Sequence, residues 1–413
     1  MRDMKDSGIE WVGQIPKNWK VMANKYVMHK TKEIVPIYRG EDILSLTTNG
    51  VIVRDLDAGG KMPASFDGYQ RLNPGNLLMC LFDYDVTPRC IGLIKDNGIT
   101  SPAYSQFIVD KDNHAAYYYY YYLMIDHSKA LLHMAKNLRH SFTEEQLGMI
   151  YTPVPPVEEQ HRIASFLDTK CAEIDALTAD IQKEIEKLQE YRKSVITEAV
   201  TKGLDPDVEM KESGIEWIGE IPVDWNCCKQ KYEIQMINGR AFKDSEFEYD
   251  GKYPILRVGN LFSNPTWYTS SLELSPDKYC NKGDLLYSWS MSYAPVIWQG
   301  DKVIFHYHIW KVLLNSGINK KYVYYYLLAL TDAIKAEIHE TTMGFITMGI
   351  MNNSAFAFPE TTEQEAIASF LDSKCAEIDS IISDKQKQLD TLAEYRKSLI
   401  YEYVTGKKEV PEC

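Results

Sequence analysis

The chain has 413 residues, of which 45% are hydrophobic and 25% charged, a composition typical of a globular protein with two or three domains. No run approaches the ~18 apolar residues of a membrane helix, and the amino-terminal MRDMKDSGIEW lacks the apolar stretch of a secretory signal. Eight cysteines without CxxC pairs argue against a zinc site and favour reduced thiols, so we expect a cytoplasmic protein.

The formal net charge of −13 argues, taken alone, against a nucleic-acid partner. The charge is unevenly distributed, however. Residues 153–209 and 359–413 carry −6 and −5, whereas residues 22–152 and 228–358 carry −1 and +1. The two larger, nearly neutral segments can therefore present a locally basic face to DNA.

The sequence contains an internal duplication. MKDSGIEWVGQIPKNW at 4–19 recurs as MKESGIEWIGEIPVDW at 210–225, and EQHRIASFLDTKCAEID at 159–175 recurs as EQEAIASFLDSKCAEID at 363–379. EYRKS at 190–194 returns at 394–398, so three blocks repeat in the same order. Between them the halves share only traces, such as NPGNLL against NKGDLL. This pattern indicates one scaffold used twice to recognise two different things.

The first half, residues 1–157, is predicted to be a compact α+β domain because short β-like runs such as DILSLTT and YSQFIV alternate with turns. The tyrosine run AYYYYYYLMID at 116–126 could stack on bases, but a helix that packs its rings into the core is the favoured interpretation. Polar side chains near predicted turns and strand ends are candidates for DNA contact, with a solvated surface role as the alternative for each: Thr48, Asn49, Arg54, Arg71, Arg89, Arg139 and His140.

Residues 158–203 are predicted to form a long central helix. No proline or glycine occurs in 158–200. Apolar residues recur at every seventh position, and further apolar residues on one side of this series widen it into a stripe. The seven-residue series is Leu167, Ile174, Ile181, Leu188 and Val195, and the flank is Ile163, Leu177, Ile185 and Tyr191. Pro155 and Pro156 precede the segment and Gly203 follows it, as start and stop signals should.

Residues 204–361 are predicted to form a second α+β domain with its own aromatic run, KYVYYYLLAL. Its candidate DNA contacts are Asn238, Arg240, Lys243, Arg257 and Asn260. Arginine can fork onto guanine, asparagine can pair with adenine, and lysine suits phosphate. His306 and His308 alternate on an expected strand and should share a face, where a structural or DNA-facing role is favoured over metal binding.

Residues 362–413 are predicted to form a second long helix, with Leu371, Ile378, Leu392 and Leu399 in the stripe and Lys385 interrupting it. Because a long amphipathic helix cannot bury its stripe alone, we expect the two helices to pack antiparallel. The two variable domains would then lie at opposite ends, related by a pseudo-twofold axis. An ordinary core helix in each domain is the alternative.

Motifs for catalysis are absent from the sequence. It has no GxxxxGK[ST] phosphate loop and no GxGxxG after a strand. Asn264-Pro265-Thr266-Trp267 matches only part of the Asn-Pro-Pro-aromatic motif of adenine methyltransferases, because the second proline is missing. We therefore expect no catalytic residue and no metal site in this chain.

The repeated blocks resemble those of the specificity subunits of type I restriction-modification enzymes. The resemblance is carried by SGIEWVGQIP and SGIEWIGEIP, and by PPVEEQHRIASFLD and TEQEAIASFLD. The NGRAFK segment and the GNLL and GDLL turns are similar to those of the family's target-recognition domains. The second copy departs from the pattern where Glu360-Thr361-Thr362 follows Pro359.

The resemblance implies that the chain is a non-catalytic subunit whose two target-recognition domains each read one half of a bipartite, asymmetric DNA site. It implies helices that set the spacing and dock two modification subunits, which methylate adenine with S-adenosylmethionine. Restriction (motor-nuclease) subunits would complete the complex, and ATP and Mg²⁺ would belong to partner subunits. Two alternatives remain: an enzyme with fused recognition domains, and a coiled-coil adaptor that binds protein without DNA recognition.

Overall fold

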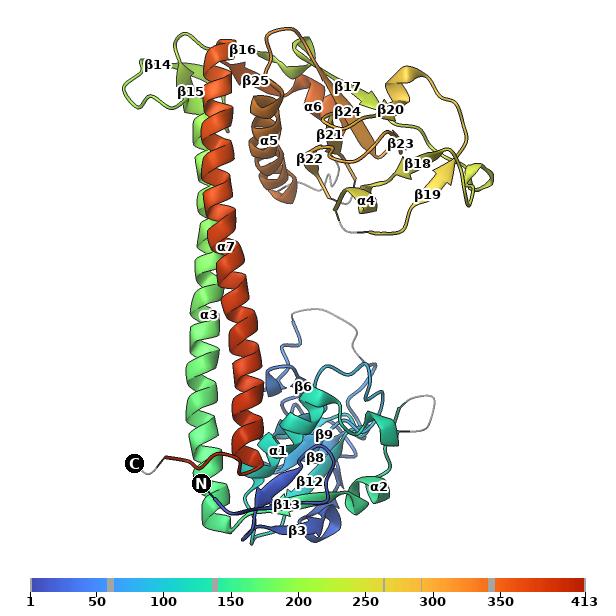
Figure 1. Ribbon diagram of the computed structural model, residues 1–413, viewed down its shortest axis with the longest axis vertical. Coiled ribbons are helices and arrows are strands. Elements are labelled where there is room, and N and C mark those ends of the chain that lie inside the picture. Colours follow the sequence, from blue (N-terminus) through green and yellow to red (C-terminus); the bar gives the residue numbers. More distant parts are fainter. Residues whose placement is uncertain are drawn as a thin grey trace. The chain divides into compact units, whose positions relative to one another are not determined.

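The computed structural model describes residues 2–57, 63–135, 140–262, 264–290, 292–340 and 346–411, without the side chains of 337–340 (Figure 1). The chain divides into two compact units. Unit 1 comprises Met1–Ile181 and Gln386–Cys413, and unit 2 comprises Gln182–Lys385. Each unit therefore contains one variable domain and a part of both long helices. In unit 2 both helix parts adjoin the domain in the sequence, whereas in unit 1 one of them comes from residues 386–413. Within the described residues, no helix is both long enough and apolar enough to span a membrane.

Unit 1 is built mainly of short antiparallel strands. A four-stranded sheet has the order β10-β9-β12-β4, a three-stranded sheet has the order β11-β8-β5, and three strand pairs complete the unit, β1-β2, β3-β13 and β6-β7. The strands are β1 (Met4–Asp6), β2 (Gln14–Pro16), β3 (Lys20–Ala23), β4 (Met28–Thr31), β5 (Glu33–Ile34), β6 (Leu44–Thr47), β7 (Gly50–Val53), β8 (Gln70–Leu72), β9 (Leu77–Met79), β10 (Ile91–Leu93), β11 (Gly98–Thr100), β12 (Ser105–Val109) and β13 (Tyr151–Val154). The helices of this variable domain are α1 (Ala115–Ser128) and α2 (Glu144–Met149).

Unit 2 has two four-stranded sheets, β17-β24-β21-β22 and β19-β18-β23-β20, and the pairs β14-β15 and β16-β25. The strands are β14 (Met210–Ile215), β15 (Gly219–Pro222), β16 (Asn226–Lys229), β17 (Ile234–Asn238), β18 (Tyr253–Leu256), β19 (Tyr268–Ser270), β20 (Tyr279–Cys280), β21 (Leu285–Ser288), β22 (Ala294–Ile297), β23 (Val303–Phe305), β24 (Ile309–Leu314) and β25 (Ala355–Phe358). Its helices are α4 (Val258–Phe262), α5 (Lys320–Glu340) and α6 (Met348–Asn353).

The variable domains share a common topology although their sequences diverge. The sheet order β4-β12-β9-β10 in unit 1 is the order β17-β24-β21-β22 in unit 2. The parallel bridge between Ile43 and Ile99 in unit 1 matches the parallel pairing of β18 with β23. The two β6-β7 strands therefore correspond to β18 and β19. Between them, unit 1 has a two-residue turn where unit 2 inserts α4 and a loop.

The repeated acidic segments form two long helices, α3 (Val157–Lys202) and α7 (Thr361–Val404). Helix α3 begins directly after Pro155 and Pro156, and Gly203 follows it in a left-handed conformation with φ +76°. Helix α7 ends well before residue 413, because Gly406 adopts φ +69° and the chain continues as a tail. These glycines stop the helices at the position that the C-terminal glycine signal predicts.

The two helices pack antiparallel within each unit, as the stripe predicts. In unit 1, Phe166 contacts Tyr403 and Asp175 pairs with Arg396. Residues later in α3 therefore pair with residues earlier in α7, as in an antiparallel arrangement. In unit 2, Glu184 pairs with Lys385, and Arg192 pairs with Asp379. Lys385, which interrupts the stripe, is therefore used in an ion pair between the helices.

The buried stripe is narrower than the sequence predicts. Leu167, Ile174 and Ile181 are buried, but Leu177 and Tyr191 of the predicted flank are about half exposed, at 48% and 50%. A pair of helices covers only the strip where the two helices touch, so Leu177 and Tyr191 stay exposed although Ile163 and Ile185 of the same flank are buried.

The tyrosine runs lie in the cores, which confirms the favoured interpretation. Helix α1 buries five of the six tyrosines at positions 117–122, and the sixth, Tyr119, is partly buried. Helix α5 buries Tyr322, Tyr325 and Tyr326. In unit 1 these rings pack against α3 and the end of α7, and in unit 2 against α7 and the end of α3. Tyrosines placed there cannot stack on DNA bases.

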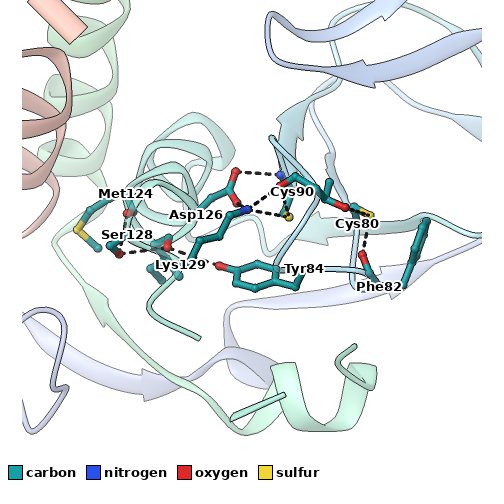
Figure 2. A network of polar contacts seen from close by, with 10 residues as sticks. Cys80, Phe82, Tyr84, Cys90, Met124, Asp126, Ser128 and Lys129 are labelled. Atoms are coloured by element: carbon teal, nitrogen blue, oxygen red, sulfur yellow. Dashed lines mark hydrogen bonds and ion pairs between the residues drawn. The ribbon is translucent and has the colours of Figure 1, made fainter. Parts of the chain in front are cut away.

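A buried polar network attaches the loop between β9 and β10 to α1 (Figure 2). The Asp126 carboxylate accepts hydrogen bonds from the Cys90 amide at 2.8 Å and from the Lys129 ammonium at 2.7 Å. Lys129 also donates to the Thr87 carbonyl at 2.7 Å and lies 4.7 Å from the centre of the Tyr84 ring. Burial, with the Asp126 charge nearby, raises the pKa of the Cys90 thiol well above its usual range. The network thus adds polar contacts to a loop whose Tyr84 and Cys90 are already buried in the core.

Replacing Leu167 by alanine should lower the free energy of unfolding of unit 1 by about 2–5 kcal/mol, because its fully buried side chain leaves a cavity between α3 and the core. Denaturant unfolding of the full chain, followed by circular dichroism, measures the change. Leu177→Ala is the matched control on the same helix and should change stability by less than about 0.5 kcal/mol, because Leu177 is half exposed. Equal effects of the two changes would contradict the narrow stripe.

Replacing Asp126 by alanine should destabilise unit 1 by about 3 kcal/mol, because it leaves the Lys129 ammonium and the Cys90 amide without their buried acceptor. Ser128→Ala is the control, because the Ser128 hydroxyl only bonds back to carbonyls of its own helix. Thermal unfolding of both variants gives the comparison. A stable Asp126→Ala protein would show that the network does not hold the loop.

Candidate nucleic-acid interface

The repeated blocks contact one another in the same way in both units. We call blocks 4–19, 159–175 and 190–194, with their second copies, the frame. Trp19 donates its indole N–H to Glu159 at 3.0 Å, and Trp225 donates to Glu363 at 3.3 Å. The neighbouring glutamine, Gln160 or Gln364, accepts from the first amide before α1 or α5, at 2.8 and 2.7 Å. The Glu-Gln pair of the repeated motif thus joins each long helix to its own variable domain.

Tyrosines of the variable domains complete the frame. Tyr120 donates to Asp168 and Tyr325 donates to Asp372, both at 2.8 Å. Tyr117 donates to the carbonyl of Val404 at 2.8 Å, and Tyr322 shares its hydroxyl hydrogen between the carbonyls of Val200 at 3.1 Å and Ala357 at 2.7 Å. Each variable domain is therefore bonded to the beginning of one long helix and to the last turn of the other. The frame surfaces are engaged in the protein interior, which leaves other faces of the variable domains for a ligand.

In the first domain, Thr48 and Asn49 form the exposed turn between β6 and β7, where the Thr47 hydroxyl bonds the Asn49 amide at 3.1 Å. Arg54 follows β7, and its backbone amide donates to Ile43. Arg71 lies on β8 between two carboxylates, with its Nε 3.0 Å from Glu33 and Nη2 3.8 Å from Glu41. The turn and Arg54 thus share one hairpin, whereas Arg71 is neutralised within the domain.

The other candidates of this domain lie around the loop held by the Asp126 network. His140 pairs with Asp85 of that loop at 2.9 Å. Arg89 lies beside Tyr119 and His127 of α1, and its charge adds to the burial that lowers the pKa of His127 to about 4. Arg89 therefore faces the helices rather than open solvent. Arg139 lies outside the described residues.

In the second domain, Arg240 forms a bidentate pair with Glu246, at 3.0 and 2.6 Å, and lies 5.2 Å from the centre of the Phe242 ring. The Asn238 side chain accepts from the Trp310 indole at 2.7 Å. Lys243 is exposed, with its backbone amide bonded to Glu246. The Arg240 fork is thus already matched by a carboxylate, whereas Asn238 and Lys243 are both exposed.

Arg257 and Asn260 lie where β18 ends and α4 begins. The Asn260 side chain accepts from the Arg257 amide at 3.2 Å and donates to the carbonyls of Asn264 and Thr266 at 3.1 and 2.8 Å, so it shapes the loop. Arg257 itself is exposed and lies 5.1 Å from the centre of the Tyr268 ring. All twelve candidates remain predictions as DNA contacts, because no bound DNA tests them.

The structure places His306 and His308, for which the sequence favours a structural or DNA-facing role, in the connection between β23 and β24 together with Tyr307. We call these three residues the histidine turn. The two histidine rings lie 4.8 Å apart, so they share a face as expected. His306 still forms a parallel bridge with Arg240, but the expected strand is interrupted at Tyr307 and His308, where the Ile309 amide donates to the His306 carbonyl at 3.0 Å and closes a turn.

Gly239 allows this close approach, because a Cβ there would lie 2.3 Å from the His306 carbonyl oxygen. Burial, with His308 and Arg257 nearby, lowers the pKa of His306 to about 4. Burial and the Arg257 charge also lower the pKa of His308. Both rings are therefore neutral at pH 7, and each can donate and accept hydrogen bonds. The alternation of His306 and His308 was the only signal for this turn in the sequence.

The remaining candidates for chemistry are side chains that could bind a metal ion or act as thiols. Within the described ranges, no three His, Cys, Asp or Glu side chains are grouped so that they could hold a metal ion. The cysteines described there are free thiols: Cys80, Cys90, Cys171, Cys227, Cys228, Cys280 and Cys375. The histidine turn has neutral rings beside a cation and aromatic rings, an arrangement suited to binding.

Comparisons with known proteins identify a family for this chain. The family model described as the type I restriction modification DNA specificity domain matches residues 91–187 and 222–391, well over half of the chain. Two curated relatives from Methanocaldococcus jannaschii are the type I restriction enzyme MjaVIII specificity subunit, 29% identical, and the putative MjaX specificity subunit, 30% identical. The alignments cover 63% and 65% of this chain and 63% and 62% of the relatives' own length.

Solved structures share the fold at low identity. A chain from a study of complex assembly and conformational transition of the type I R-M system is 13% identical, with a TM-score of 0.73 over 95% of this chain and 99% of that one. The HsdS subunit from Thermoanaerobacter tengcongensis is 14% identical, with a TM-score of 0.51 over 95% and 98%. The fold is thus the two-domain α+β arrangement of these proteins, and the chain belongs to the type I restriction modification DNA specificity family.

Proposed function

We propose that this chain is the DNA sequence-reading subunit of a type I restriction-modification complex, in which each variable domain reads one half of an asymmetric, bipartite site. One observation carries the proposal above others. The same Trp–Glu, Tyr–Asp and Tyr–carbonyl bonds hold both variable domains, while the outer loops of those domains differ. A shared frame with unlike loops suits a protein that presents two different readers on one scaffold.

The readers would bind DNA through side chains away from the frame. The pair β6-β7 of the first domain corresponds to the pair β18-β19 of the second. The first pair carries Thr48 and Asn49 in its turn, and the second has Arg257 at the end of β18. A polar turn and an arginine offer different hydrogen-bond patterns to base edges. Two unlike half-sites would follow, and their order would make the site asymmetric.

The long helices would set the spacing of the half-sites and dock two modification subunits. Their exposed surfaces are acidic, so they would repel phosphate and favour contact with protein. The modification subunits would supply S-adenosylmethionine and the methyl transfer, and restriction subunits would use ATP and Mg²⁺. This chain would contribute the choice of sequence and no catalytic group.

The purified chain should transfer no methyl group to DNA, and methylation should appear when adenine methyltransferase subunits are added. Transfer of labelled methyl groups from S-adenosylmethionine measures this, and sequencing of the modified adenines should give two short motifs separated by a fixed gap. Methyl transfer by the chain alone would disprove its non-catalytic role. A sequence-independent methylation pattern, or a complex that assembles without binding DNA, would instead identify an adaptor.

Removing one heptad from each helix, residues 182–188 of α3 and 383–389 of α7, should shorten the permitted gap between half-sites. These segments face each other, because Glu184 pairs with Lys385 inside them. Seven residues correspond to about 10 Å of helix, or about 3 base pairs, with only ~20° of rotation. Methylome sequencing measures the gap.

The control for this change exchanges the charges of one helix–helix ion pair in a double Glu184→Lys, Lys385→Glu variant. It keeps the length of both helices, so the gap should remain that of the parent protein. A shortened variant that assembles and methylates with an unaltered gap would contradict the spacing role of the helices.

A further inference from the structure

We infer that the second variable domain reads its half-site through a surface formed by Arg257, Tyr268 and the histidine turn, and that Arg257 selects a guanine. The inference rests on the proposed function and names the reading groups within it. The three elements come from β18, β19 and the β23–β24 connection, which lie far apart in the sequence.

Strand pairing brings these groups together. Strands β18 and β23 are parallel, with Leu256 paired to Phe305, so the residues that follow them, Arg257 and His306, emerge at the same edge of the sheet. The His306 amide donates to the Leu256 carbonyl at 2.9 Å, which closes this edge. Strand β19 pairs antiparallel with β18 and places Tyr268 beside Ile255. The Arg257 guanidinium lies over the Tyr268 ring as a result.

A stack of aromatic rings supports the histidine turn from below. Tyr287 stacks on Trp310 and Trp310 stacks on Trp289, each with ring centres 5.7 Å apart and interplanar angles of 13° and 17°. The Trp289 indole N–H donates to the Tyr307 carbonyl at 2.8 Å, and its amide donates to the His308 carbonyl at 3.2 Å. Tyr287 and Trp310 are buried, so the stack leads from the core to the turn. Reading groups need such rigid support, because a loosely held side chain discriminates poorly.

Arg257 differs from Arg71 and Arg240 in that, among the described residues, no carboxylate pairs with its guanidinium. Arg71 faces Glu33 and Glu41, and Arg240 is held by both oxygens of Glu246. Within the part of the chain that the structure describes, Arg257 has no carboxylate within ion-pair distance. Its fork is therefore available, while the Tyr268 ring and the Asn260 bond to its amide restrict how it can move. An arginine held in this way costs less entropy when it forms two hydrogen bonds.

Exposed aromatic side chains also lie on the elements that carry Arg257, Tyr268 and the histidine turn. Phe262, Trp267, Tyr268 and Tyr307 are each between 38% and 46% exposed. An arginine flanked by exposed rings and neutral histidines fits DNA better than an acidic protein surface, because the rings contact sugars and bases while the guanidinium meets guanine O6 and N7. The corresponding connection of unit 1, residues 101–104, has no histidine, and its one ring, Tyr104, is partly buried, so the two domains would read different bases.

The test selects preferred sites from double-stranded DNA in which the bases are randomised. It uses the full chain, assembled with its methyltransferase subunits, and compares the parent protein with Arg257→Ala and Arg257→Lys. Arg257→Ala should lose about tenfold or more of the preference for guanine at one position of one half-site, and Arg257→Lys should lose part of it, because a lysine ammonium lacks the rigid planar fork that matches guanine O6 and N7. Preferences in the other half-site should remain unchanged.

Lys302→Ala is the matched control. The Lys302 ammonium also lies over a tyrosine, 4.3 Å from the centre of the Tyr279 ring, but at the opposite end of β23 from His306. Its removal should leave all base preferences intact. His308→Ala should alter preference at a position next to the guanine, since the two side chains share one surface.

The outcomes separate the possible roles. A uniform loss of affinity that Arg257→Lys restores would identify a phosphate contact and overturn the inference. Unchanged preferences in both variants would overturn it as well. A parent complex that selects no sequence at all would instead refute the proposed function, which keeps the two failures distinct.

Discussion

A hydrogen bond between a tyrosine hydroxyl and the last turn of a distant helix underlies the architecture of both units. Tyr117 donates to Val404 and Tyr322 donates to Val200, and both tyrosines are fully buried. Because the final carbonyls of a helix have no partner within the helix, a buried helix end needs such a donor. The bond requires the end of one long helix to lie against the variable domain that precedes the other. Antiparallel pairing of α3 and α7 within each unit satisfies this requirement, and the Asp175–Arg396 and Arg192–Asp379 pairs support the same register.

Charge is distributed in accordance with this frame. The long helices carry most of the excess acid, and several of their basic residues are used in ion pairs between the helices. In the variable domains, carboxylates hold several of the cations, as Glu246 holds Arg240 and Glu33 holds Arg71. Total charge is therefore a poor guide to DNA binding in this chain. What matters is which cations lack an internal partner, and where the fold places them.

The frame could be predicted from the sequence because its signals are local or repeated. The heptad of Leu167, Ile174 and Ile181 predicts a buried stripe, and the tyrosine run predicts a core helix. Leu177 and Tyr191 were assigned to the stripe because periodicity alone does not tell how wide the partner surface is. The bonds of His306 to Leu256 and of Tyr307 to Arg240 depend on strand register between distant segments. That register, and with it the histidine turn, could be found only in three dimensions.

The division of each helix between two units has a consequence for biosynthesis. Unit 1 begins at the amino terminus, yet its core includes Leu399, Ile400 and Val404 near the end of the chain. A ribosome adding ~5–20 residues per second needs on the order of ten to forty seconds to make the intervening segment. During that interval the apolar side of α1 and the early part of α3 lacks the α7 residues that later cover it. The variable domain of unit 1 is therefore translated before that of unit 2 but completed after it.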